Sequence, residues 1–202
     1  MRPQLFAGIP FDPEKDLGRA YNRFMETVPE DAYGVILDHD VMFTTIHWYD
    51  QICDAIETVP GACFSGVTHR IKCPFQVAEE ADMKNHDMRY HREIGKKRLE
   101  NLDLLEVTTN DRTPSGFLIC LPKQAWREMG GFPSGFHLLD KRVWQGLKLI
   151  GRRIFIIKGL YLYHWHRGGG PDSDPYVDGP WCKQHTLPDG RVYGSTQEGQ
   201  LE

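Results

Sequence analysis

The stretch "YGVILDHDVMF" at residues 33–43 constrains this chain more than any other. Its first five residues are typical of a buried strand, and Asp38, His39 and Asp40 follow them without a break. Carboxylates are costly to bury without a partner, so the end of this strand is a place where acids are needed. Because side chains alternate along an extended chain, we expect Asp38 and Asp40 on one side and His39 on the other.

Predicted strands and helices alternate around this stretch. Apolar runs predict strands within 4–10, 33–37, 61–71 and the start of 113–132, and one or two strands within 153–166. Helical spacing of apolar residues predicts helices within 12–28, 47–59, 83–102, the later part of 113–132 and 137–151. This alternation favours a single α/β domain over residues 1–170 with a mostly parallel central sheet. Residues 171–202, rich in Gly, Pro and Asp, are expected to form a loop or tail.

Composition excludes several classes of protein. The chain has 202 residues, 40% of them hydrophobic, and a formal net charge of −4, which gives no overall attraction to nucleic acid or anionic membranes. No run is long enough to span a membrane, and no signal peptide precedes the first polar residues. The 5 cysteines form no CxxC pair and indicate reduced thiols. We therefore expect a cytoplasmic protein.

The two acids point to a metal ion. In open α/β sheets ligands bind at the carboxyl ends of the strands, where Asp38 and Asp40 stand. Neighbouring carboxylates repel each other unless a cation compensates, and Mg²⁺ or Mn²⁺ prefers such oxygen ligands. His164 and His166, at the end of the last predicted strand, offer a nitrogen ligand that would favour Mn²⁺. The alternatives are acids that cap the next helix or pair with surface cations, and histidines that pack as aromatic rings.

Five segments, in this order, resemble the family 2 type of GT-A-fold glycosyltransferases. "VILDHDVMF" resembles the D-x-D element of that family, and "DLGRAYNRFM" resembles the helix before it. "GFLICLPKQAWREMGGFPSGF" resembles the segment on the acceptor side, "HLLDKRVWQGLKLIG" the acidic helix and "LYLYHWHR" the late strand with a metal-binding histidine. The resemblance covers roughly residues 5–167. Asp38 comes earlier in the chain than in most members of the family.

The resemblance implies a single-domain, three-layer GT-A fold and a metal-dependent transfer of a sugar from a nucleoside-diphosphate sugar, UDP-linked by analogy, to an acceptor hydroxyl. In this interpretation Asp38, Asp40 and His164, with His166 as second choice, hold Mn²⁺ or Mg²⁺. Asp140 stands where the family has its catalytic base. The implied donor-binding residues are Pro10, Asn22, Asp38 and Arg167, and those on the acceptor side are Gly130, Gly131 and Phe132.

Other interpretations stay open from the sequence. The same acids and histidines would serve a metal-dependent nucleotidyltransferase or phosphoryl hydrolase, and the 5 tryptophans would suit a non-catalytic sugar-binding module. Asp140 also fits a helix N-terminus stabilised by its charge, and the Gly-Gly-Phe at 130–132 fits a helix cap followed by a core residue. Basic residues within 84–98 leave modified nucleic acid as an acceptor beside a glycan or a small molecule.

Overall fold

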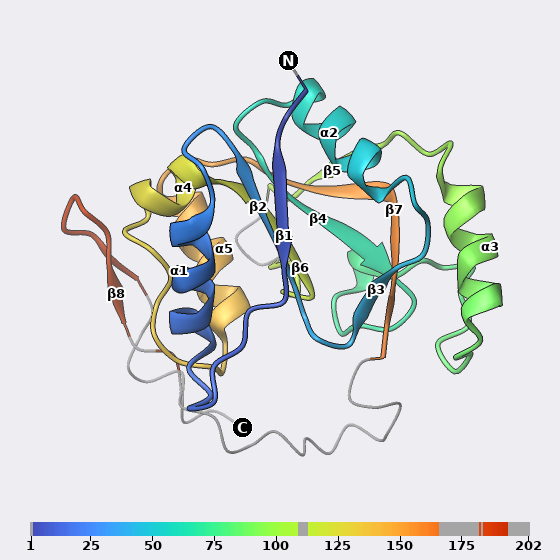
Figure 1. Ribbon diagram of the computed structural model, residues 1–202, viewed down its shortest axis with the longest axis horizontal. Helices are drawn as coiled ribbons and strands as arrows, with labels where there is room; N and C mark the ends of the chain where they lie inside the picture. The colour runs from blue at the N-terminus through green and yellow to red at the C-terminus, as the bar shows by residue number, and fades with distance from the viewer. Residues whose placement is uncertain (1, 109–112, 166–181, 183, 194–202) are drawn as a thin grey trace.

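The computed structural model describes residues 2–108, 113–165, 182 and 184–193 (Figure 1). Its central sheet has seven strands: β1 (Leu5–Gly8), β2 (Tyr33–Leu37), β3 (Val41–Phe43), β4 (Cys63–Thr68), β5 (Leu104–Glu106), β6 (Leu118–Pro122) and β7 (Ile154–His164). The helices are α1 (Leu17–Thr27), α2 (Trp48–Thr58), α3 (Met88–Arg98), α4 (Lys123–Glu128) and α5 (Leu139–Leu149), with a 3-10 turn at Pro74–Gln76. The predicted α/β class is confirmed.

The sheet is mixed, so the prediction of a mostly parallel sheet was wrong. The strand order is β1-β2-β6-β4-β7-β3, with β5 also paired to β7. β1 is parallel to β2 and β4 is parallel to β7, whereas β6 is antiparallel to both of its neighbours. β3 and β5 are likewise antiparallel to β7. The physical reason is that strand direction depends on which strands become neighbours, and a helix between two strands, such as α3 between β4 and β6, does not by itself make them parallel.

Four strands nevertheless share one direction. Since β6 runs opposite to both β2 and β4, the pairings make β1, β2, β4 and β7 point the same way. The carboxyl ends of these four strands lie along one end of the sheet, toward the bottom of Figure 1. Ligands of α/β sheets bind at such an edge, and Asp38 and His164 both lie there.

Helices cover both faces of the sheet and make it the middle layer of three. On one face α1, α4 and α5 bury Met25, Ala125 and Trp144 against the inward side chains of β2, β6 and β7. On the other face α2 buries Ile52 and Ile56. Figure 1 shows α1, α4 and α5 side by side and α3 at the far side of β7. The core therefore consists of two apolar clusters separated by the sheet.

The predicted helices are present, and local chemistry explains where they begin and end. Asp16 and Asp87 cap α1 and α3, each by accepting a hydrogen bond from a backbone N–H of its helix. Gly151 ends α5 in the left-handed conformation, with φ of +77°. The apolar run at 4–10 is typical of a buried strand, but β1 is a half-exposed edge strand, so that expectation was wrong. The short strands β3 and β5 were not predicted.

Within the predicted C-terminal tail, residues 184–193 contain a hairpin of β8 (His185–Thr186) and β9 (Val192–Tyr193). Leu187 and Tyr193 are buried and belong to the cluster under α5. The hairpin is therefore part of the folded domain. Among the described residues, no helix has both the length and the apolar character needed to cross a membrane.

Candidate metal centre

The Asp-His-Asp stretch forms the turn between β2 and β3. Asp38 follows the last residue of β2, and its backbone N–H donates to the carbonyl of Phe117 at 3.1 Å. Asp40 precedes β3, and its carbonyl accepts from the backbone N–H of Trp165 at 2.9 Å. Val41 stands opposite His164 in the β3–β7 ladder. Backbone pairing thus fixes both acids relative to the end of β7.

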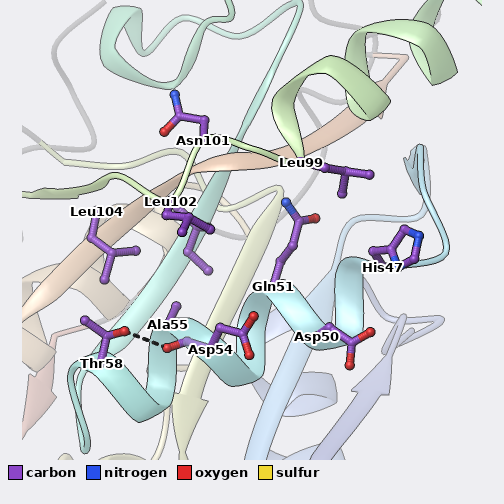
Figure 2. A pocket seen from close by; sticks show the side chains of 11 residues that line it. His47, Asp50, Gln51, Asp54, Ala55, Thr58, Leu99, Asn101, Leu102 and Leu104 are labelled. Atoms are coloured by element: carbon purple, nitrogen blue, oxygen red, sulfur yellow. Dashed lines mark hydrogen bonds between the residues drawn. The ribbon is translucent and has the colours of Figure 1, made fainter.

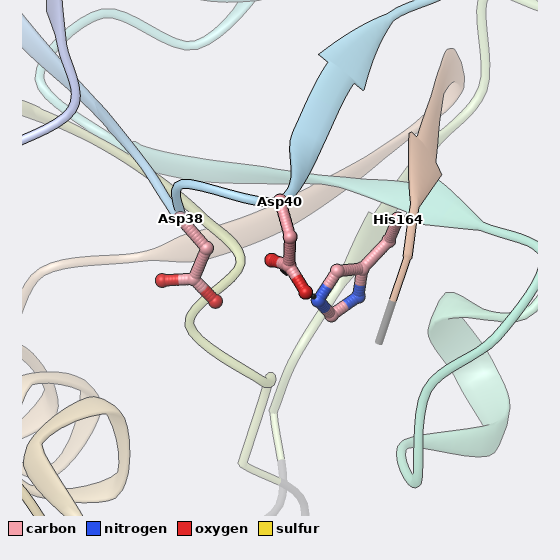
Figure 3. Close-up of side chains that lie close together, drawn as sticks. All are labelled: Asp38, Asp40 and His164. Carbon is pink, nitrogen blue, oxygen red and sulfur yellow. Dashed lines mark ion pairs between the residues drawn. The ribbon is translucent and has the colours of Figure 1, made fainter. Parts of the chain in front are cut away.

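Three side chains converge at this turn. Ligand atoms of Asp38, Asp40 and His164 all lie within 4.8 Å of one another, and they form the one group of this kind among the described residues (Figure 3). His164 Nε2 lies 3.3 Å from Asp40 Oδ1. The imidazole of His164 is buried and stacks on Phe117, with ring centroids 5.5 Å apart. The structure thus brings together the three residues that the sequence suggested as metal ligands.

The two carboxylates of this turn would be stabilised by a positive charge. Burial, and then the charges of Asp40 and Asp140, raise the pKa of Asp38 to about 8 against a hydrogen bond from Tyr21 that lowers it. Burial also acts to raise the pKa of Asp40, but the hydrogen bond and charge of His164 outweigh it and leave that pKa lowered. A pair of adjacent, half-buried acids is an arrangement that a divalent cation stabilises.

The residues fit such a cation. Two carboxylates and one imidazole match the oxygen and nitrogen preferences of Mn²⁺, and Mg²⁺ accepts the oxygens equally well. Ligand atoms of an octahedral ion lie roughly 3 to 4 Å apart, given metal–ligand bonds of about 2.1 Å. The spacing within the 4.8 Å limit is compatible with that geometry. The donor set is compatible with either ion, and its imidazole nitrogen favours Mn²⁺.

Asp140 lies beside this group. It stands in the first turn of α5, where its carboxylate accepts from the backbone N–H groups of Gly116 (3.1 Å) and Lys141 (2.7 Å). A Cβ on Gly116 would come 2.5 Å from Asp140 Cβ, so only glycine fits there. Burial raises the pKa of Asp140 against these two bonds. The structure therefore brings Asp140 to the metal centre and also places it at a helix N-terminus, as both interpretations required.

Tyr21 is a member of the site that the sequence did not indicate. It lies on α1, is buried, and forms a hydrogen bond with Asp38. Burial, Asp38 and Asp140 together raise the pKa of its hydroxyl well above the ordinary value. Its position in the apolar stripe of α1 predicted a core residue, and only the spatial proximity of Asp38 identifies a second role.

The residues expected on the acceptor side lie elsewhere. Gly130 and Gly131 have φ of +73° and +87° and form the turn after α4, which confirms their capping role. The Oδ1 atom of Asn22 accepts from the backbone N–H of Phe132 and from Trp126 Nε1, and its Nδ2 donates to the carbonyl of Phe132. Together these residues fasten α4 and the following loop to α1. Phe132 makes an edge-on contact with Tyr21, which borders the candidate metal centre.

Two other expectations concern the donor side. Gly8 pairs with Ile36 across β1 and β2, so Pro10 reaches the same edge of the sheet as Asp38. His166 and Arg167 lie outside the described residues.

Two pockets lie away from the centre. One of about 530 Å³ is bounded by α2, the segment after α3, and Ile157, toward the opposite end of β7 from His164 (Figure 2). Another, of about 580 Å³, is lined by Asn22, Trp126 and the two glycines after α4. Neither includes a residue of the metal centre, so chemistry and not cavity size identifies the candidate site.

Comparisons with known proteins do not assign the chain to a family: no protein-family model matches it, and no curated protein matches its sequence.

Proposed function

We propose that this protein is a metal-dependent glycosyltransferase that transfers a sugar from a nucleoside-diphosphate sugar, in the first instance UDP-linked, to an acceptor hydroxyl. The observation that supports the proposal most strongly is the convergence of Asp38, Asp40 and His164, with Asp140 beside them, at the carboxyl edge of the sheet. This is the arrangement that the resemblance of the sequence implies for a GT-A-like enzyme.

Each residue has a role in this reaction. Asp40 and His164, with Asp38, hold the cation, for which we favour Mn²⁺ over Mg²⁺ because of the imidazole nitrogen. A divalent cation bound there supplies positive charge to the diphosphate leaving group. Tyr21 fixes the orientation of Asp38 through its hydrogen bond. Pro10, at the end of β1, lies on the side where we place the nucleotide.

Asp140 is the candidate base. Its backbone hydrogen bonds hold the carboxylate in one orientation, and its raised pKa suits a group that takes a proton near neutral pH. In an inverting transfer Asp140 would accept the proton of the acceptor hydroxyl as the new glycosidic bond forms. The acceptor is a glycan, a small molecule or a modified nucleic acid.

The compartment is part of the same proposal. All five cysteines are free, and four of them are buried. Reduced thiols are usual in the cytoplasm, so we propose a cytoplasmic enzyme.

Thermal unfolding with nucleotides and metals tests the proposal. We expect UDP to raise the unfolding temperature only when Mn²⁺ is present, because the diphosphate binds through the cation. A screen of nucleotide-sugars for slow, Mn²⁺-dependent hydrolysis then needs no acceptor. Stabilisation by nucleoside triphosphates with release of pyrophosphate would instead indicate a nucleotidyltransferase. No response to any nucleotide or metal would overturn the enzyme assignment.

A further inference from the structure

A group of aromatic rings borders the metal centre on the side of β4 and β7. His69 follows β4 directly and stacks on Tyr163 of β7, with centroids 5.1 Å apart and planes 12° apart. The ring centroids of His91, on α3, and of His69 are 4.4 Å apart. His86 Nδ1 is 2.9 Å from the Tyr163 hydroxyl. We call the rings of His69, Tyr163, His91 and His86 the aromatic wall. They connect the end of the sheet to α3.

The wall adjoins the proposed cation site. Trp165 comes next after His164 in the chain, and its backbone N–H holds the Asp40 carbonyl. The charge of Asp40 contributes to a raised pKa of Tyr163, after burial. His164 contributes to a lowered pKa of His69, after burial and the nearer histidines. Backbone pairing therefore places Trp165 beside Asp40, and a molecule lying across the end of β7 would reach both groups of residues.

His91 and His69 differ in their hydrogen bonding. His91 Nε2 lies 2.7 Å from the carbonyl oxygen of Asn85, which can only accept, so Nε2 donates and Nδ1 accepts from the Tyr161 hydroxyl at 2.7 Å. His91 is thus fully satisfied. His69 is completely buried, yet neither of its ring nitrogens has a partner among the described residues. An unmet buried donor or acceptor destabilises the folded protein, and a polar ligand group would remove that cost.

Above these buried rings lies an exposed aromatic pair. The side chain of Trp165 is 51% exposed, and its ring lies 6.2 Å from that of His86, which is also exposed. Large exposed aromatic rings beside unsatisfied polar groups are characteristic of ligand sites, in which flat apolar faces and a few polar atoms act together.

We propose that Trp165, His86 and His69 form the acceptor subsite and that it takes a hydroxyl-bearing sugar ring. The apolar face of the sugar packs on Trp165 and His86, and one of its hydroxyls satisfies His69 when the rings that cover it move aside. The inference rests on the proposed function, because it makes the site beside the cation the place of the second substrate. It moves the acceptor from the Gly-Gly-Phe turn to the ends of β4 and β7.

Saturation-transfer NMR with a panel of methyl glycosides tests this subsite. The probes are the methyl glycosides of glucose, galactose, mannose and N-acetylglucosamine, with uridine as a ring of the other class, each measured on the full chain without a donor. We expect at least one glycoside to bind the wild-type protein, and Trp165→Ala to weaken that binding at least tenfold. Trp165→Phe should retain most of it, because the flat surface is conserved.

Two further variants separate binding from folding. Phe11→Ala is the matched control, since Phe11 is 79% exposed on the loop after β1, at the other end of the strand order. It should leave glycoside binding unchanged. His69→Phe keeps a ring under Tyr163 but removes the unsatisfied nitrogens. We expect it to weaken glycoside binding severalfold without lowering the unfolding temperature, a combination that a purely structural role would not produce.

The outcomes distinguish a failure of the proposed subsite from a failure of the proposed function. Glycoside binding that depends on Trp165, without any effect of UDP and Mn²⁺ on unfolding, would support the subsite and overturn the glycosyltransferase proposal. A Mn²⁺-dependent effect of UDP, with no glycoside bound or with binding indifferent to Trp165, would overturn the subsite alone. Binding of uridine in place of every glycoside would also overturn it and make the wall part of a nucleotide site.

Discussion

The carboxylate of Asp40 lies 3.3 Å from Nε2 of His164, and the backbones of β3 and β7 hold the two residues together. The ladder pairs Val41 with His164, and the N–H of Trp165 bonds the carbonyl of Asp40. A slip of one residue in this register would turn His164 away to the other face. Two candidate ligands are thus positioned by the same short strand pair, which explains why a three-residue strand is present at this place.

Asp40→Asn tests the proposed metal ligand with little change of shape. We expect the affinity for Mn²⁺ to fall more than about 100-fold, because loss of a ligand costs more than loss of its supporting bonds. Any Mn²⁺-dependent hydrolysis of nucleotide-sugars should fall with it, while the fold is retained. Calorimetric titration of Mn²⁺ and circular dichroism measure the two effects.

The control for Asp40 is its neighbour. His39→Asn changes the exposed middle residue of the same turn, and it should leave Mn²⁺ affinity unchanged. If Asp40→Asn bound Mn²⁺ as tightly as the wild type, the three residues would not form the metal site.

Asp140→Asn tests whether Asp140 acts as the catalytic base or only as an acid that stabilises the N-terminus of α5. If Asp140 is the base, turnover should fall by about 10²–10⁴ while the Mn²⁺-dependent stabilisation by UDP stays the same. If the carboxylate serves only the dipole of α5, turnover should persist and stability should fall by about 0.3–1 kcal/mol. Steady-state kinetics with a glycoside acceptor and urea unfolding distinguish the two results.

The part of this structure that the sequence predicted well is local. α1, α2, α3 and α5 follow from the spacing of their apolar residues and from caps such as Asp16. β2 was predictable because a run of five buried residues ends abruptly in polar ones. The convergence of Asp38, Asp40 and His164 followed from the rule that ligand residues stand at strand ends.

The part that the sequence did not predict depends on which strands become neighbours. The apolar run of β6 does not indicate which strands will be its neighbours. In the structure β6 lies between β2 and β4 and is antiparallel to both. The exposure of β1 follows from its edge position in the same way. His69 was overlooked because its complete burial beside Tyr163 and His91 depends on these distant neighbours and not on its own segment.

Asn22→Ala tests whether that residue supports the fold or binds the donor. All three of its hydrogen bonds described above go to Trp126 and Phe132. We expect a loss of about 1–3 kcal/mol in the free energy of unfolding, because buried partners lose their bonds, and no change in UDP affinity of the folded protein. Urea unfolding and calorimetric titration of UDP with Mn²⁺ measure these quantities.

Asn22→Asp is the matched variant, because it keeps the accepting oxygen but replaces the donor to the Phe132 carbonyl with a second, negatively charged oxygen. It too should lose stability, while the UDP affinity of the folded protein stays the same. Unchanged stability in Asn22→Ala together with weaker UDP binding would support the donor-binding role that the resemblance implies.

The ion pairs of Asp12 should make the stability of α1 depend on acid pH. The buried carboxylate accepts from Arg19 Nε and from Arg23 Nη2, both at 2.7 Å. The hydrogen bond from Arg19, together with the Glu14 backbone N–H and both arginine charges, lowers the pKa of Asp12 from 3.8 to about 2, against the effect of burial. Between those two values the unfolded chain binds more protons than the folded one, so stability rises with pH there. The contribution is complete above the unfolded pKa and is lost as pH falls through the folded one.

Asp12→Asn should therefore be less stable than the wild type at neutral pH, and the difference should shrink as pH falls from 3.8 to about 2. Urea unfolding at a series of pH values gives the difference directly. Asp189→Asn is the control, because the Asp189–Arg191 pair is half exposed on both sides and its removal should change little at any pH. A difference for Asp12→Asn that stays constant across this range would show that the residue contributes through its shape and hydrogen bonds, not through its charge.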